Sequence, residues 1–327
     1  MTDVFAVSIS ARAVLNLHSL NNEGGEGNQT QTRMVDVFTK DNEGKLRQVS
    51  VNAISGDMFK HIQAAHLHRI AVDQGLILCE ACRKFDANRM SADPTFRDWI
   101  KTKPTQVEVI DRLIGSCAVD DLEGNLITEG GLSAPRKSVG EFGWIVGIPD
   151  ANTTDEYFHV KYAPDRREKP TDKDAREGNL GQAIFHRPAS SGEYAMVCHF
   201  DTARIGYNDI RQGYVIEPAE RDSHYKALLE SVLYTFLEPG GAMRNTQLPH
   251  IMDFTGAVTV STRIVPAPAL SPLAEGYRED LAQTAQALNQ LHGENSVVVM
   301  PFESMAQFTD IMRELIQTTT PYSLKVG

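Results

Sequence analysis

One switch of pattern, between residues 49 and 67, most constrains how this chain can fold. A β-type apolar run from Val49 to Ile54 stops at Ser55-Gly56, and a helical spacing of apolar residues begins directly after it. Ser55 is a favoured N-cap residue, and Asp57 suits the first helical turn. A helix that begins in this way points free backbone N–H groups outward. The junction therefore predicts either an ordinary capped helix or a seat for a phosphate group.

Three residues near this junction favour the phosphate interpretation. Gly56 would let another chain approach closely, and Lys60 and His61, one turn further on, could bring positive charge to the same place.

Composition limits the classes of protein to which the chain can belong. Its 327 residues, 41% of them hydrophobic, can bury a large core in one domain or two. No apolar run approaches the roughly 20 residues that span a bilayer, and the N-terminus lacks a signal-peptide pattern. Four cysteines are too few for a disulfide framework at this length. We therefore expect a cytoplasmic protein with no membrane partner.

The net charge of −11 argues against general adhesion to nucleic acid, although it leaves room for a local basic groove on an acidic body. Any claim of nucleic-acid binding must therefore rest on particular segments.

The remaining pattern predicts strands and helices in a mixed order. Residues 4–18 alternate as a long, half-buried strand, residues 23–32 form a glycine-rich loop, and residues 34–54 form a hairpin. The helix from Asp57 extends to about Asp73, and residues 115–126 return to the core as a strand or turn. Further helices are expected at 105–115, 221–237, 277–292 and 303–317, and further strands at 142–148, 257–265 and 297–300. Together they predict an α+β sandwich with helices on one face of a sheet.

A highly charged segment, Tyr162–Asn179, interrupts this pattern and is nearly free of apolar residues. Strand-like sequence lies on both sides of it. The segment is therefore expected to be a solvated loop or the end of a projecting arm.

Metal, nucleotide and catalytic motifs are weak. Cys79 and Cys82 form a CxxC pair, but the nearby His66 and His68 would lie on different helix faces and make a poor second pair of zinc ligands. Buried, inert thiols are therefore the favoured interpretation, and we expect no metal and no cofactor. No GxSxG motif and no phosphate-binding loop motif is present.

Four polar or glycine-rich segments lie at the ends of the expected elements, as in loops that follow a phosphate backbone without contacting bases. They cover residues 16–22, 55–61, 135–138 and 240–246.

These segments also carry a resemblance to a known family. The chain resembles DevR-type, Csa-like backbone subunits of type I CRISPR effector complexes (Cascade), with subtypes I-A and I-B nearest. The matching segments follow the family order over about three quarters of the chain: LNLHSLN at 15–21, AISGDMFKH at 53–61, CAVDDLEG at 117–124, RKS at 136–138 and GGAMR at 240–244.

The resemblance implies an α+β fold with an RRM-like (ferredoxin-like) palm, a helical finger insertion and a β-hairpin thumb. The palm is expected in three parts, at 1–65, 105–149 and 193–327, with the finger at 66–104 and the thumb at 150–192. The many acidic residues of the thumb depart from what RNA contact would favour.

The resemblance also implies a function. Copies of the protein would line up along a CRISPR RNA (crRNA), together with other Cascade subunits, and present the guide to the target DNA strand in antiviral defence. Such a subunit is not an enzyme. The implied RNA-binding residues are Asn16, His18, Ser19, Asn21, Ser55, Gly56, Lys60, His61, Arg136, Lys137, Ser138, Met243, Arg244 and Asn245.

Two other functions remain open. An RNA-cleaving subunit like those of type III complexes would need a carboxylate after the first strand, where Glu23 and Glu26 lie, but no ligand cluster accompanies them. A DNA-binding autoregulator would need a basic recognition helix, and no helix-turn-helix pattern is visible.

Overall fold

The alternating N-terminal run forms the centre of a ten-stranded sheet. In the computed structural model, which describes residues 1–40, 43–129, 131–162, 182–243 and 245–325, this run is divided into β1 (Thr2–Val4) and β2 (Ala6–His18). β2 lies between β11 (Gln182–Phe200) and β14 (His250–Ser261) and pairs antiparallel with both. β2 is therefore an interior strand of the sheet, paired along both of its edges.

The sheet continues outward from these three strands in the order β15-β14-β2-β11-β10-β6-β5, and its neighbours along this path are antiparallel. The added strands are β5 (Met34–Lys40), β6 (Leu46–Ile54), β10 (Ile145–Tyr162) and β15 (Val297–Phe302). The predicted 34–54 hairpin is thus confirmed.

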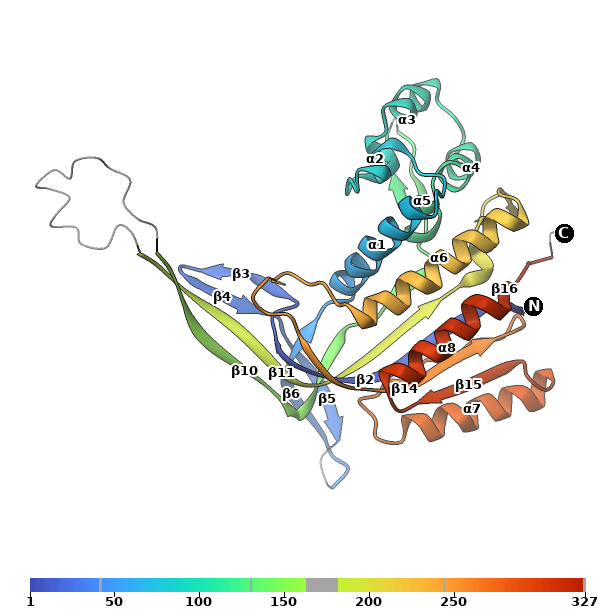
Figure 1. The fold of residues 1–327 in the computed structure, drawn as a ribbon. Helices are drawn as coiled ribbons and strands as arrows, with labels where there is room; N and C mark the ends of the chain where they lie inside the picture. Colours follow the sequence, from blue (N-terminus) through green and yellow to red (C-terminus); the bar gives the residue numbers. More distant parts are fainter. Residues whose placement is uncertain (41–42, 130, 163–181, 244, 326–327) are drawn as a thin grey trace, which may run out of the picture.

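Three helices cover one face of the sheet and a fourth covers the other (Figure 1). α1 (Gly56–Asp73), α6 (Pro218–Leu237) and α8 (Met305–Thr318) lie together, and Phe236 and Phe308 pack on Phe254 of β14. α7 (Tyr277–His292) instead packs its Tyr277 and Leu281 on Ala257, which points to the opposite face of β14. The prediction of helices on one face only is therefore wrong.

The layer formed by α7 and the segment before it also changes the environment of β2. Ser8 and Ser10, on the face that alternation predicts to meet water, are buried. The Ser8 hydroxyl lies 2.8 Å from the carbonyl oxygen of Ala267, in the segment that leads into α7. β2 is thus buried on both faces.

β10 and β11 form a long hairpin that extends away from the helices (Figure 1). Their pairing is continuous from Asn152 opposite Gly192 to Tyr162 opposite Gln182. Apart from Tyr162, the predicted charged segment lies at 163–179, outside the described residues.

A group of short helices lies beyond the C-terminal end of α1 (Figure 1). We call residues 74–139 the helical insertion. It contains α2 (Glu80–Arg83), α3 (Pro94–Trp99), α4 (Gln106–Ser116) and α5 (Ala118–Glu123), the 3₁₀ turns Arg89–Ala92 and Ile100–Thr102, and the strand pair β7 (Asn125–Ile127) and β8 (Ala134–Arg136). The finger boundary expected after residue 65 falls inside α1.

Two local predictions are corrected. Residues 115–126, expected as a strand or turn, contain the helix α5, whose six residues are too few to show a helical repeat. Residues 23–32, expected as a loop, mostly pair as β3 (Asn22–Glu26) and β4 (Gln29–Thr32).

The other elements are short: β9 (Gly140–Phe142), the 3₁₀ turn Thr202–Arg204, β12 (Tyr207–Asn208), β13 (Gly213–Tyr214) and β16 (Thr319–Pro321). Within the described ranges, none of the helices has the length and apolar character required to cross a bilayer.

Candidate nucleic-acid interface

The end of β2 is joined to the start of α1 by a short hydrogen-bonded chain. The side-chain oxygen of Asn21 accepts from the backbone N–H of Ser55 at 3.1 Å and from the Ser55 hydroxyl at 2.9 Å. The Ser55 oxygen in turn accepts from the N–H of Met58 at 3.2 Å. The predicted N-cap is confirmed, and Asn21 holds it in one orientation.

Two glycines bring further backbone to the same place. A Cβ on Gly56 would lie 2.3 Å from the carbonyl oxygen of Phe142, so this glycine is required by β9 rather than by a ligand. A Cβ on Gly241 would lie 2.6 Å from the Cα of Leu20, and the N–H of Ala242 donates to the Leu20 carbonyl at 3.1 Å. The loop after α6 therefore packs against the end of β2.

The segment that follows β8 reaches the same helix from the other side. The ammonium group of Lys60 donates to the carbonyl oxygen of Gly140 at 3.4 Å, and the Ser138 hydroxyl lies 2.8 Å from the same oxygen. Lys60 is half-buried, and this burial lowers the pKa of its ammonium group. All four polar segments predicted from sequence thus meet around the first turns of α1.

Only some of the predicted RNA-binding side chains are available on the surface there. His61, Lys137 and Asn245 are exposed, whereas Asn16, Ser55, Lys60, Ser138 and Met243 are partly buried. We call His61, Lys137 and Asn245 the exposed rim. The predicted Arg244 lies outside the described residues.

Three predicted residues at the end of β2 face inward, which corrects their expected place on the surface. His18 is 1% exposed, with its ring edge-on to Tyr194, and burial lowers the pKa of His18 to about 4. The buried Ser19 hydroxyl donates to the side-chain oxygen of Asn22 at 2.7 Å. Asn21 is buried on Ser55, as described above.

Arg136 is also internal. Its side chain does not lie on the surface where the predicted contact with RNA would require it. Its guanidinium is fully buried and donates to Asp121 at 2.7 Å, to the carbonyl oxygen of Tyr207 at 2.6 Å and to that of Arg204 at 2.8 Å. Asp121 also lies 2.9 Å from Nδ1 of His224 on α6. Although burial by itself acts to raise it, the pKa of Asp121 is lowered by Arg136 and His224.

A pocket of about 240 Å³ opens beside α1. Lys60, His61 and Arg89 line it, and the buried carboxyl of Glu123 lies close enough to interact with Lys60 and Arg89. Burial raises the pKa of Glu123, and both cations oppose that shift. Sequence reasoning missed Arg89, because nothing in its local sequence connects it to α1.

The cysteine pair has neighbours that the sequence did not indicate. Cys79, Cys82, Cys117 and Asp120 lie together, all buried. His66 and His68, judged a poor second pair of ligands from sequence, are elsewhere: Nε2 of His66 lies 3.0 Å from the carbonyl oxygen of Glu238, and Nε2 of His68 lies 3.1 Å from that of Arg83.

Glu23, one of the two carboxylates considered for RNA cleavage, forms an ion pair with Arg33. The Arg33 guanidinium also lies over the ring of Trp144, 5.2 Å from its centroid. The other carboxylate, Glu26, belongs to β3.

Comparison with known proteins gives the class of the chain. A family model described as "CRISPR-associated negative auto-regulator DevR/Csa2" matches residues 9–282, well over half of the sequence. The chain therefore belongs to the DevR/Csa2 family, and the resemblance carried by its motifs is confirmed.

Individual relatives agree with this class. The chain is 26% identical over 289 residues to the "CRISPR-associated protein Cas7/Cst2/DevR" of Methanocaldococcus jannaschii, covering 85% of this chain and 86% of that protein. It is 23% identical over 239 residues to a "CRISPR-associated protein Cas7/Csa2" of Saccharolobus solfataricus, covering 71% of each chain.

A solved structure agrees with the overall fold. A chain of a "CRISPR RNA-guided surveillance complex, pre-nicking" superposes with a TM-score of 0.50 at 11% identity, covering 95% of this chain and 99% of that one. The two proteins therefore share a mixed α/β fold.

Proposed function

We propose that this protein is a crRNA-binding backbone subunit of a type I Cascade complex, of subtype I-A or I-B, in the cytoplasm. The observation that carries the proposal is the meeting of four separated, family-matching segments around the start of α1. The exposed rim would contact the phosphates of the guide, while the buried members would hold the loops in place. Guide bases, left free, would then pair with the target DNA strand.

The same proposal assigns roles to the parts of the fold. The central sheet with the start of α1 and with α6 corresponds to an RRM-like palm, residues 66–104 to the finger, and the part of the β10–β11 hairpin within 150–192 to the thumb. Copies of the chain would stack head-to-tail along the guide, since an interface of that kind propagates into an open filament. Other Cascade subunits would complete the complex.

The role proposed for the protein is binding without catalysis. Glu23 is paired with Arg33, an arrangement that suits a structural ion pair better than a metal-binding carboxylate. Incubating the purified chain with labelled guide and target RNA, and with duplex DNA, separates the three functions. Retention without cleavage supports the scaffold, cutting that depends on a divalent ion supports the nuclease, and preference for duplex DNA supports the regulator.

The exposed rim is tested with Lys137→Ala. The substitution removes one positive charge that would neutralise a phosphate. The slope of log K for guide-RNA binding against log salt concentration should therefore become less steep by roughly 0.7. Lys101→Ala is the matched control, because Lys101 is an exposed lysine of the helical insertion that is paired with Asp98. If both variants bind RNA as the parent does at every salt concentration, Lys137 does not contact the guide.

A further inference from the structure

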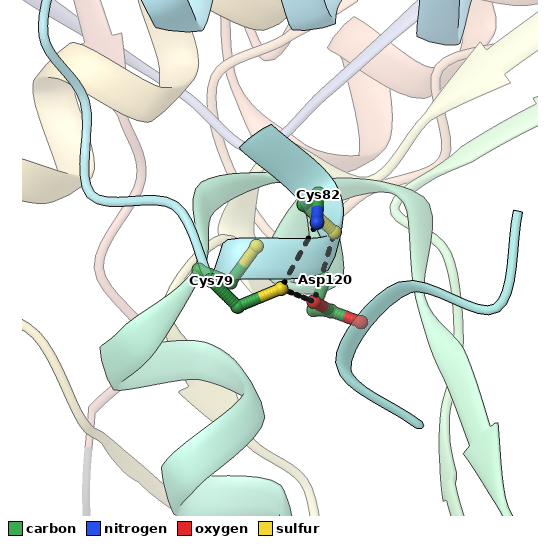
Figure 2. Close-up of side chains that lie close together, drawn as sticks. Cys79, Cys82 and Asp120 are labelled. Carbon is green, nitrogen blue, oxygen red and sulfur yellow. Dashed lines mark hydrogen bonds between the residues drawn. The ribbon is translucent and has the colours of Figure 1, made fainter. Parts of the chain in front are cut away.

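Three thiols and one carboxyl group form a compact cluster inside the helical insertion. The Sγ atom of Cys79 lies 3.8 Å from Oδ2 of Asp120, and that of Cys82 lies 3.4 Å from the same oxygen. Figure 2 shows both sulfur atoms directed toward this carboxyl group. With Cys117 included, the four ligand atoms all lie within 4.8 Å of one another, and all four residues are buried.

These distances fit a tetrahedral metal ion. A zinc ion with Zn–S bonds of about 2.3 Å and Zn–O bonds of about 2.1 Å keeps its ligand atoms roughly 3.5–3.8 Å apart. The two sulfur–oxygen separations of 3.8 and 3.4 Å lie close to that range.

The sequence spacing fits as well. Structural zinc sites commonly take their ligands as two close pairs. Here Cys79 and Cys82 form one pair in the turn that begins α2, and Cys117 and Asp120 form a second pair with the same spacing at the start of α5. The second pair is not evident from sequence, because its last member is an aspartate and because two 3₁₀ turns and the helices α3 and α4 lie between the two pairs.

The surroundings orient the ligands as a zinc site requires. The side-chain amide of Asn125 donates to Oδ1 of Asp120 at 2.7 Å, which leaves Oδ2 directed at the sulfur atoms. The backbone N–H of Cys82 donates to Sγ of Cys79 at 3.2 Å. No basic side chain forms an ion pair with Asp120 within the part of the chain that the structure describes. A buried carboxylate without a cation is costly, and a bound metal ion would supply the missing charge.

We propose that Cys79, Cys82, Cys117 and Asp120 bind a structural Zn²⁺ ion that joins α2 to α5. Four protein ligands leave no open coordination position, so the ion serves stability rather than catalysis. Zinc suits this donor set, because soft thiolates in a tetrahedral arrangement select it over magnesium or calcium. Cys82 also lines the pocket beside α1, which gives the ion a route from solvent.

The position of the site gives it a consequence for the rest of the molecule. α5 continues from Asp120 to Asp121, the partner of Arg136, and to Glu123 beside the pocket. An ion that fixes the start of α5 therefore also fixes the buried charges that position the segment around Lys137. The proposal does not depend on RNA binding.

The first test measures zinc in the full chain, purified under reducing conditions without a histidine tag. Atomic spectroscopy should find one zinc per chain, and Cys82→Ser should lower this at least tenfold. Cys198→Ser is the matched control and should keep the full amount, because Cys198 is a buried cysteine of β11 outside the cluster. Replacing zinc with Co²⁺ should produce the thiolate-to-cobalt absorption of a three-sulfur site.

A second variant separates loss of metal from loss of fold. Asp120→Cys should retain one zinc and strengthen the cobalt absorption, since it changes three sulfur ligands to four. Removing zinc from the parent with a chelator should lower its melting temperature, and adding Zn²⁺ should restore it. The proposal is overturned if the reduced parent neither contains nor takes up Zn²⁺, if Cys82→Ser binds as much zinc as the parent, or if Cys79 and Cys82 are found as a disulfide in the native chain.

Discussion

The junction of β2 with α1 and the helical insertion behind it are held together in different ways. At the junction, neutral hydrogen bonds join Asn21, which follows β2, to Ser55, which caps α1. In the helical insertion, a buried ion pair between Asp121 and Arg136 joins the helix α5 to the short strand β8. Loss of one neutral hydrogen bond lowers the free energy of unfolding only modestly. A buried charge that loses its partner lowers it much more.

This contrast explains two adjacent residues with opposite environments. Arg136 is internal and Lys137 is exposed, although both were predicted to contact RNA. Because Lys137 directly follows Arg136, we expect the buried pair to hold Lys137 in place at the surface. The following predictions test this difference, beginning with the largest expected effect.

Arg136→Met should destabilise the protein most. It leaves the carboxylate of Asp121 buried without its guanidinium partner, a change that typically costs about 3–5 kcal/mol of unfolding free energy. Urea unfolding measures the effect. Lys137→Met is the control and should leave the midpoint nearly unchanged. Pairing Arg136→Met with Asp121→Leu should recover part of the loss, and a double variant less stable than Arg136→Met alone would contradict the assignment.

The second prediction concerns pH at the junction. The pKa of His18 is about 4 in the folded protein, below the ordinary value of 6.5, because burial disfavours the charged ring. The unfolded chain therefore takes up the proton first, so this contribution to stability is present above pH about 6.5 and is lost as the pH falls toward 4. Below both pKa values, the loss amounts to roughly 3 kcal/mol of unfolding free energy.

Comparing unfolding free energies at pH 7 and pH 4.5 tests this. In His18→Gln the fall in stability between the two pH values should shrink by most of that amount, while His61→Gln, at an exposed histidine, should behave as the parent does. An unchanged pH dependence in His18→Gln would show that His18 is accessible to water.

The smallest effect is expected at the helix cap. Ser55→Ala removes an N-cap bond worth about 1 kcal/mol, together with the hydroxyl bond to Asn21. Ser304→Ala is the matched control, since Ser304 caps α8 through Gln307 and has, among the described residues, no partner equivalent to Asn21. The excess loss in Ser55→Ala, measured by thermal unfolding, reports the bond to Asn21. Equal losses would mean that this bond adds nothing to the cap.

Sequence patterns were sufficient where an element is long and its apolar spacing regular. The strand at 4–18, the 34–54 hairpin, the cap at Ser55 and the helix at 277–292 follow from periodicity and capping alone. The family motifs also gave the class of the protein. In each case the information is local, because neighbouring residues decide the period and the cap.

The environments of individual polar residues could not be predicted in this way. In the run Asp120, Asp121 and Glu123, three acids in one short helix enter three separate internal sites: the cysteine cluster, the bond to Arg136 and the pocket beside Lys60. From sequence alone, residues 115–126 are predicted only to return to the core as a strand or turn, with no partner indicated for any of the three acids. Their partners come from distant segments, so only the packing of α5 between α1, α2 and α6 determines which carboxyl meets which partner.

The sequence by itself therefore determined the α+β class, the long elements and the family, since these depend on local periodicity and on short motifs. The tertiary structure decided that His18 and Arg136 are buried, that Lys137 is exposed, and that an aspartate completes the cysteine cluster. The physical reason is that burial and charge pairing are properties of the assembled layers. A residue's own neighbours in sequence do not reveal which surface another helix will cover.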